Sequence, residues 1–380
     1  MIYLDYNATT PIDPQVYEAM QPYFESQFGN PSNTYALGKA AKTAVEKARY
    51  QVASLIGAEA REVFFTSCGS ESNNTVVKGV AYSNRGKGRH IVTSVIEHPA
   101  ILKPLAFLET LGFEITYVPV DSKGMVSVEA IEQAIRKDTI LVTIMHSNNE
   151  TGTLQPIAAI GEICKRKNVL FHTDASQSMG KIPVKVNELN VDFLTIAGHK
   201  LYAPKGIGAL YIREGAQIES LIHGASQEEG IRAGTENVPY IVGLGEAAEL
   251  AQASLKTHHL IELKRYFYQE LKKTFGNKIC LNGEVENSLP NTLNISFIRQ
   301  SGHDILAAIP QISTSTGSAC HSGEKTISPV LAAMGLEENI AYGAIRFSVG
   351  RFTTKEELDQ TIQLLEDALA MRSNDSMPEK

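Results

Sequence analysis

Residues 195–206 read TIAGHKLYAPKG and place a lysine at the end of an apolar strand. Segment 191–198 (VDFLTIAG) is strand-like, Gly198 frees the backbone at the corner, and a proline and a glycine interrupt the chain soon afterwards. An ammonium group is costly to bury, and an ordinary surface lysine does not need this setting. Lys200 is therefore the first candidate for a chemical role.

Helix-like and strand-like segments alternate around this corner, between about residues 15 and 250. Strands are predicted at 62–67, 89–96, 114–120, 139–146, 169–175, 191–198 and 206–213. Helices are predicted at 40–57, 71–83, 98–112, 127–137 and 156–168. Short apolar strands separated by helices predict an α/β fold with a doubly wound, largely parallel sheet.

The pattern changes after residue 250. Segment 258–275 predicts a long amphipathic helix, 291–298 and 344–350 predict strands, and 354–372 predicts a terminal helix. These elements indicate a second, smaller α+β domain.

Composition excludes several classes of protein. The chain has 380 residues, 43% of them hydrophobic and 20% charged, which is typical of a globular protein. No apolar run reaches the roughly 18 residues that a membrane span needs, and the first residues do not read as a signal peptide. A net charge of −7 argues against direct binding of nucleic acid, which depends on basic residues.

The four cysteines lie far apart in the sequence and form no CxxC pair, so neither a disulfide framework nor a zinc site is expected. No HExxH motif is present, and no metal is expected. Free thiols favour a reducing, cytoplasmic location.

Polar residues follow several predicted strands, and ligands of such sheets bind beyond the carboxyl ends of the strands. Asp174 and Gln177 follow one strand, Lys200 another, and Asn149 a third. The segment 66–72 (TSCGSES) opens a helix and offers backbone N–H groups to a phosphate, although for this segment taken alone a simple helix cap is the more common explanation. The lysine (Lys200), the carboxylate (Asp174) and the proposed phosphate turn at 66–72 together suggest pyridoxal 5′-phosphate, which a lysine amine holds as a Schiff base.

Cys320 lies in a small, polar segment, 312–325 (ISTSTGSACHSGEK), where a thiol can be accessible. His321 and Lys325 favour its thiolate form. Cys68, in the proposed phosphate turn, is a rival nucleophile but reads better as a packing residue. Cys164 and Cys280 read as core or incidental cysteines.

Taken together, the motifs resemble those of cysteine desulfurases of the NifS/IscS type, which are class V aminotransferase-family enzymes of PLP fold type I. The resemblance covers essentially the whole chain and is carried by 64–74 (FFTSCGSESNN), 97–102 (EHPAIL), 172–184 (HTDASQSMGKIPV), 197–213 (AGHKLYAPKGIGALYIR) and 315–323 (STGSACHSG). It implies a large domain, residues 13–255, with a mostly parallel seven-stranded type of sheet. It also implies a small α+β domain from residues 1–12 and 256–380, and a homodimer.

The same resemblance implies a role for each matching residue. Lys200 forms the Schiff base and shuttles a proton, Asp174 pairs with the ring nitrogen, Gln177 binds the ring oxygen, and His98 stacks on the ring. The remaining implied roles are phosphate binding by Gly69, Ser70, His199 and the partner subunit's Thr235, cofactor binding by Ala197 and Asn149, substrate-carboxylate binding by Asn149 and Arg346, and nucleophilic attack on sulfur by Cys320. L-cysteine becomes L-alanine, and a Cys320 persulfide passes sulfur to an acceptor protein.

Some positions depart from the family pattern, and alternatives remain open. Ala197 stands where relatives often have serine, Glu229 where they often have arginine, and His321 resembles specialised members such as desulfurases of DNA phosphorothioation. The acceptor pathway implied is iron–sulfur cluster assembly, tRNA thiolation or DNA phosphorothioation. The alternatives are selenocysteine lysis, another class V aminotransferase-type reaction, and a non-enzymatic scaffold.

Overall fold

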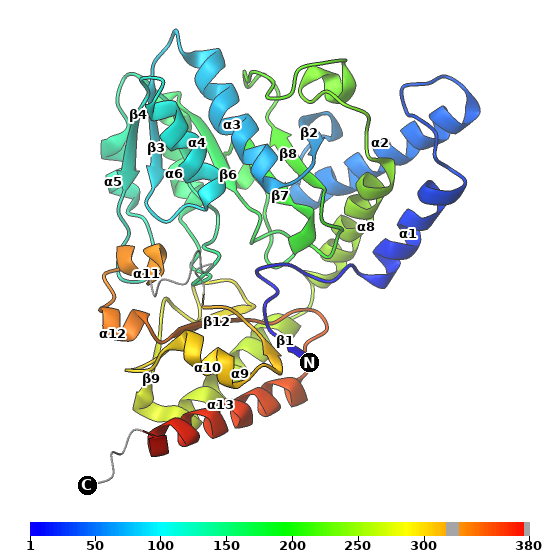
Figure 1. Ribbon diagram of the computed structural model, residues 1–380. Coiled ribbons are helices and arrows are strands. Elements are labelled where there is room, and N and C mark those ends of the chain that lie inside the picture. The colour runs from blue at the N-terminus through cyan, green and yellow to red at the C-terminus, as the bar shows by residue number, and fades with distance from the viewer. Residues whose placement is uncertain (317–326, 376–380) are drawn as a thin grey trace.

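The structure, a computed structural model, describes residues 1–316 and 327–375 (Figure 1). Its strands are β1 Ile2–Tyr3, β2 Val63–Thr66, β3 His90–Ser94, β4 Glu114–Val118, β5 Thr139–Thr143, β6 Leu170–Asp174, β7 Phe193–Ala197, β8 Gly208–Ile212, β9 Ile279–Leu281, β10 Thr292–Phe297, β11 Ile312–Ser313 and β12 Ala344–Ser348. Its α-helices are α1 Pro14–Glu25, α2 Ala36–Ile56, α3 Gly69–Asn84, α4 Pro99–Glu109, α5 Val128–Ala134, α6 Ile157–Lys167, α7 Val186–Leu189, α8 Val238–Ser254, α9 His259–Phe275, α10 Gly302–Ala308, α11 Pro329–Ala333, α12 Glu338–Ala341 and α13 Lys355–Asp375. In these described ranges, no helix is long and apolar enough to cross a bilayer.

The larger sheet has seven strands in the order β2-β8-β7-β6-β5-β3-β4. Only β8 runs against its two neighbours, so the prediction of an α/β fold with a mostly parallel sheet is confirmed. Because the other strands run in one direction, their carboxyl ends meet at a single edge of the sheet. Asp174, the last residue of β6, and Ala197, the last residue of β7, therefore lie at that edge.

Helices cover both faces of this sheet. One apolar cluster joins strand residues such as Phe193 and Leu210 to α3 and α4, and another joins Leu194 and Phe171 to α2, α6 and α8. Consecutive residues of β7, Phe193 and Leu194, belong to opposite clusters because strand side chains alternate between faces. Burial on both faces explains why the strands read as continuous apolar runs.

A smaller antiparallel sheet, in the order β12-β10-β9, packs against α9 and α13 (Figure 1). The start of the chain joins this region. β1 pairs in parallel with β11, Leu4 is buried in the same apolar cluster, and Asp5 bridges to Ser348 after β1. Residues separated by most of the sequence are thus adjacent here.

One helix is shorter than the sequence predicts. The prediction of a helix over 127–137 is wrong at its end, because α5 stops at Ala134. The backbone N–H of Arg136 donates to the side-chain oxygen of Thr139 at 2.7 Å. A side-chain acceptor that competes with the helical carbonyl in this way ends the helix early.

A buried ion pair joins α2 to the turn after residue 226. Arg49 donates to both carboxylate oxygens of Glu228 at 2.7 and 2.9 Å, and the N–H of Phe65 donates to the same carboxylate at 2.8 Å. Glu228 has a left-handed φ of 45°, which the pair helps to hold. Glu229, where the sequence departs from the family pattern, is exposed.

Removal of this pair is expected to destabilise the fold. Arg49→Ala leaves the buried Glu228 carboxylate without its cation, and such a loss costs about 3–5 kcal/mol. The matched control is Arg61→Ala, which breaks an exposed pair with Glu214 and costs less than about 1 kcal/mol. Urea unfolding of the two variants measures the difference, and equal losses would contradict the structural role given to Glu228.

Candidate active site

A cavity of about 410 Å³ opens at the carboxyl edge of the larger sheet. Most of the residues singled out from the sequence line it: Gly69, Ser70, His98, Asn149, Asp174, Gln177, Ala197, His199, Lys200 and Arg346. They come from both sheets and from the loops between them. The volume lies within the range of about 300–1,000 Å³ that small-molecule sites occupy.

Lys200 ends a single turn of 3₁₀ helix, Gly198–Lys200, that follows β7. A side chain at Gly198 would meet the Ile207 carbonyl at 2.8 Å, so the tight corner needs glycine. The Lys200 ammonium donates to the Asn7 carbonyl at 3.0 Å. Burial lowers the pKa of Lys200 to about 8, against the opposing attraction of Asp174. A neutral amine, which can act as nucleophile or base, is therefore accessible near neutral pH.

Asp174 faces the same cavity with both carboxylate oxygens held. Oδ1 accepts from the backbone N–H of Ser176 at 2.9 Å, and Oδ2 accepts from the side-chain amide of Asn73 at 2.7 Å. These two hydrogen bonds fix the orientation of the carboxylate. Asp174 can therefore accept a hydrogen bond from a proton-bearing nitrogen of a ligand.

His98 caps the start of α4 and lines the cavity. Its Nδ1 accepts from the N–H of Ala100 at 3.1 Å, which places the ring proton on Nε2. Burial lowers the pKa of His98, and Lys200 lowers it further while Asp174 opposes the shift. The ring is accordingly neutral at pH 7 and offers a flat apolar face.

The N-terminus of α3 forms one wall of the cavity. The helix begins at Gly69, and no side chain caps it at Cys68. Gly69 leaves little room, because a side chain there would lie 3.2 Å from both Ala197 and Ser176. His199 lies on the same wall with its pKa lowered to about 4, chiefly by burial. Uncapped N–H groups, a serine hydroxyl and a neutral histidine suit an anion such as phosphate.

Arg346 reaches the cavity from β12 of the smaller sheet. Its guanidinium donates to the Asn149 carbonyl at 3.0 Å and to the Asp5 carboxylate at 2.5 Å. Within the described part of the chain, its Nε has no hydrogen-bond partner although it is buried. A planar cation with a free donor suits a carboxylate ligand.

One described residue of the predicted site, Thr235, does not line this cavity. Thr235 is exposed and does not line it, so it cannot contribute to the site of its own subunit in this structure. Cys320 lies outside the described residues. Among the other cysteines, Cys68 lines the cavity, and Cys164 is buried with its pKa raised to about 12 by desolvation. A thiol with such a pKa is a poor nucleophile, as expected for a core cysteine.

Sequence reasoning missed several residues that complete the site. Asn73 holds Asp174, Ser176 contributes a backbone donor, and Asn7 places its carbonyl between Lys200 and the Gln177 amide. Asn7 is itself fixed by donation to Thr292 at 2.8 Å and by donation from Asn291 at 3.0 Å. Asn73 and Ser176 lie inside segments that the sequence analysis quotes, 64–74 and 172–184, whereas Asn7 lies in neither.

The donor set fits pyridoxal 5′-phosphate. Asp174 offers an anion for a ring nitrogen, the Gln177 amide offers a donor for a ring oxygen, and the uncapped start of α3 offers donors for a phosphate. In the described residues, the buried Oδ1 of Asn73 is also without a partner at this wall. Lys200 supplies the amine to which an aldehyde can attach.

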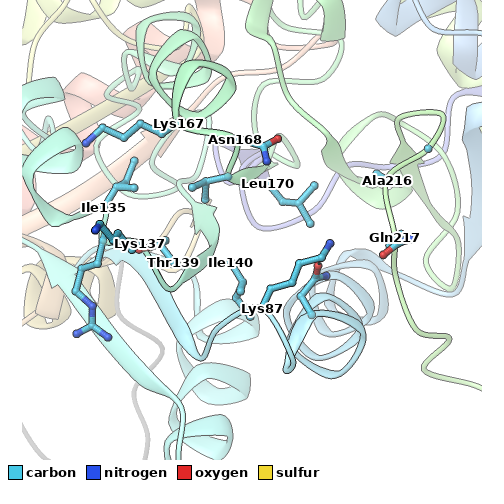
Figure 2. A pocket seen from close by; sticks show the side chains of 14 residues that line it. Lys87, Ile135, Lys137, Thr139, Ile140, Lys167, Asn168, Leu170, Ala216 and Gln217 are labelled. Atoms are coloured by element: carbon cyan, nitrogen blue, oxygen red, sulfur yellow. The ribbon is translucent and has the colours of Figure 1, made fainter.

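A larger cavity of about 720 Å³ lies at the opposite edge of the sheet, away from these residues (Figure 2). Lys87, Lys137 and Lys167 line it, as Figure 2 shows. Lys87 donates to Asn84 at the end of α3, and Lys167 ends α6. Cations at helix C-termini complement the helix dipole, which accounts for Lys87 and Lys167 without a ligand.

Comparison with known proteins gives consistent matches over nearly the whole chain. A model of the aminotransferase class-V family matches residues 2–361. A curated relative from Dictyoglomus turgidum, named cysteine desulfurase IscS, is 50% identical over 369 residues that cover 96% of this chain and 93% of the relative. A solved NifS-like protein has a TM-score of 0.91 and 39% identity, covering 97% of this chain and 99% of its own. A structure described as SspA in complex with cysteine has a TM-score of 0.83 and 37% identity, covering 93% and 100%.

Proposed function

The chain belongs to the aminotransferase class-V family, and from this premise we propose that it is a cysteine desulfurase dependent on pyridoxal 5′-phosphate. The reaction converts L-cysteine to L-alanine and transfers the sulfur atom to a protein thiol. The observation that carries the proposal is the meeting, in one cavity, of the fixed Asp174 carboxylate and the Lys200 amine of lowered pKa. A structural relative solved with cysteine supports this substrate.

The residues of the cavity divide into those that would hold the cofactor and those that would act on the substrate. Lys200, Asp174, Gln177 and His98 would hold the ring, and the wall that includes Gly69, Ser70 and His199 would hold the phosphate, while Ala197 and Asn149 line the same cavity. When bound, the cofactor supplies an electron sink for charge that develops at the substrate Cα. Asp174 serves this chemistry because two hydrogen bonds hold its carboxylate in a fixed orientation.

Lys200 is the proposed proton carrier. Its Nζ is neutral in a large fraction of molecules near pH 8, so it can take a proton from the substrate Cα and return it. The neighbouring Asn7 carbonyl holds the amine at the cavity wall while it is not so engaged. That carbonyl can only accept a hydrogen bond, so Lys200 is the donor in this contact.

Arg346 is the proposed site for the substrate carboxylate, beside Asn149. Arg346→Gln is expected to raise KM for L-cysteine roughly 10- to 100-fold, since hydrogen bonds to charged groups contribute about 1.5–3 kcal/mol. The control is Arg351→Gln, which removes a guanidinium that pairs with Asp13 and stacks on Tyr202 outside this cavity. Steady-state kinetics separate the two, and an unchanged KM in the Arg346 variant would contradict the assignment.

Cys320 is the proposed nucleophile, assigned from the resemblance because it lies outside the described residues. Its thiolate forms a bond to the substrate sulfur as the Cβ–S bond breaks. The products are L-alanine and a Cys320 persulfide, and atoms and electrons balance without an added oxidant or reductant. Transfer of the outer sulfur to an acceptor thiol restores Cys320.

We also infer a homodimer in the cytoplasm with a protein as sulfur acceptor, either a scaffold or a sulfur carrier. Exposed aromatic side chains gather on α1, α2 and the segment between them, namely Tyr17, Phe24, Phe28, Tyr35 and Tyr50. Such a surface supports burial against a second copy, in which the partner subunit's Thr235 could reach the phosphate. The free thiols of Cys68, Cys164 and Cys280 favour a reducing compartment.

The proposed domain division is 13–255 for the large domain and 1–12 with 256–380 for the small one. Two observations support it: the two sheets have separate apolar clusters, and β1 pairs with β11 rather than with the larger sheet. Arg346 then comes from the small domain to a cavity whose other walls belong mainly to the large one.

The deciding experiment supplies the purified, cofactor-loaded protein with L-cysteine and a thiol reductant. Equal amounts of L-alanine and sulfide are expected. Parallel reactions with selenocysteine, and with L-alanine plus a keto acid, test selenocysteine lysis and transamination. Faster turnover in either parallel reaction than with L-cysteine would overturn the proposed substrate.

A further inference from the structure

Lys181 is a second lysine close to the cofactor site, and none of the proposed steps uses it. It lies in the loop after β6, four residues beyond Gln177. Its ammonium donates to the Gln177 backbone carbonyl at 2.8 Å and to the Gln177 side-chain Oε1 at 3.2 Å. Both of its observed partners therefore belong to one residue of the cavity wall.

The setting is unfavourable for a charged amine. Burial lowers the pKa of Lys181 to about 7, and Lys200 and Arg346, both cations, lower it in the same direction. The charged and titratable side chains in the adjoining cavity of about 200 Å³ are Lys181, Lys200, Tyr202, His258, His259 and Arg351. A cation placed among cations is electrostatically unfavourable and weakens the fold. Its presence here therefore suggests another purpose.

The hydrogen bonds of Gln177 indicate that purpose. An ammonium group can only donate, so the amide oxygen of Gln177 has to face Lys181. The amide nitrogen then faces the other way, where it donates to the Asn7 carbonyl at 3.0 Å. The Lys200 ammonium donates to that same carbonyl at 3.0 Å. With Lys181 in place, the Gln177 N–H₂ group is kept on the side of Lys200.

We propose that Lys181 is a positioning residue of the cofactor site, which fixes the donor side of the Gln177 amide toward the cavity and places positive charge behind Lys200. This inference rests on the proposed function, because the donor is aimed at the cofactor. The Asn7 carbonyl, which can only accept, favours the same orientation, because a turned amide would set its oxygen against that carbonyl. The Lys181 ammonium adds a second restraint from the oxygen side of the amide.

The first test is Lys181→Met, which keeps the length of the side chain but removes its donors and charge. The dissociation constant for pyridoxal phosphate is expected to rise roughly tenfold, the effect of about one lost charge-assisted hydrogen bond. The pH at which the visible absorbance of the bound cofactor changes should move upward by about one unit, because a nearby positive charge no longer disfavours the protonated form.

The matched control is Lys264→Met. Lys264 is also buried and also donates to carbonyls, those of Val285 and Leu289, but it lies on α9 outside the cavity. Its loss should lower stability and leave both the dissociation constant and the absorbance transition at their parent values. If the control moved these readouts as much as Lys181→Met, a general loss of stability would explain the effect and the inference would fail.

Two more variants make the test specific. Lys181→Gln can still donate to Gln177 but carries no charge, so it should keep the affinity for the cofactor while the transition pH remains raised. In a Gln177→Ala background, Lys181→Met should cost little further affinity, because Lys181 acts through that amide. Additive losses, or a Lys181→Met enzyme with unchanged affinity and transition pH, would overturn the inference. A parent protein that bound no cofactor would instead overturn the proposed function.

Discussion

Cys320→Ser is expected to lower the rate of sulfide release from L-cysteine by about 10³-fold or more, since loss of a nucleophile removes the covalent step. A serine hydroxyl cannot hold a sulfur atom as a persulfide. The cofactor should remain bound, because the residues proposed to hold it are those of the cavity. Mass spectrometry of the parent after cysteine treatment should show about 32 Da, one sulfur atom, added to the peptide that contains Cys320.

The controls for this variant are Cys68→Ser and Cys280→Ser. Cys68 lines the cavity at the start of α3, and Cys280 lies in β9 of the smaller sheet. Both variants should retain sulfide release. If Cys68→Ser lost the activity and Cys320→Ser kept it, the sulfur would pass through the cavity thiol instead, and the assignment of the nucleophile would be wrong.

Lys200→Ala has the second large expected effect. The variant should lose covalent attachment of the cofactor and its visible absorbance, and kcat should fall by roughly 10²–10⁴-fold with the loss of the proton carrier. Borohydride reduction of the loaded parent should fix the cofactor to the peptide that contains Lys200. Lys205→Ala, an exposed lysine five residues later, is the control and should behave as the parent.

The pH dependence of cofactor capture tests the same amine. Only the neutral amine attacks an aldehyde, and burial lowers the pKa of Lys200 from 10.5 to about 8. Capture by the apoprotein should therefore accelerate as the pH rises through about 8 and level off above it. A rate that continued to rise up to about pH 10.5 would show an ordinary, solvated lysine at this position.

The sequence predicts the site best for residues that lie at the carboxyl ends of parallel strands. Asp174 and Lys200 follow consecutive strands of the larger sheet, and the common direction of those strands brings them to one edge regardless of loop detail. The alternation of helices and strands does not fix the order of the strands in the sheet. It also does not predict that β8 runs antiparallel to its neighbours. Local hydrogen bonds also escape the pattern, as the early end of α5 shows.

The supporting residues could not be predicted because their contacts depend on distant pairing. Asn7 contacts Asn149, Asn291, Thr292 and Ser348, each more than a hundred residues away in the sequence. Asn73 meets Asp174 only because α3 packs across the sheet. No period or spacing in a single sequence encodes such meetings, whereas the geometry of the sheet edge is implied by strand direction alone.

The contacts among Asp5, Asn7 and Arg346 have a consequence for the order in which the site forms during translation. Asp5 emerges among the first residues, but its partner Arg346 is synthesised 341 residues later. Until β12 has left the exit tunnel, the opening segment lacks its contacts with Arg346 and Ser348, although residues made earlier, such as Asn291 and Thr292, can already contact Asn7. This wall of the cavity can therefore be completed only when nearly the whole chain has been synthesised, because one of its contacts joins the start of the chain to a strand near its end.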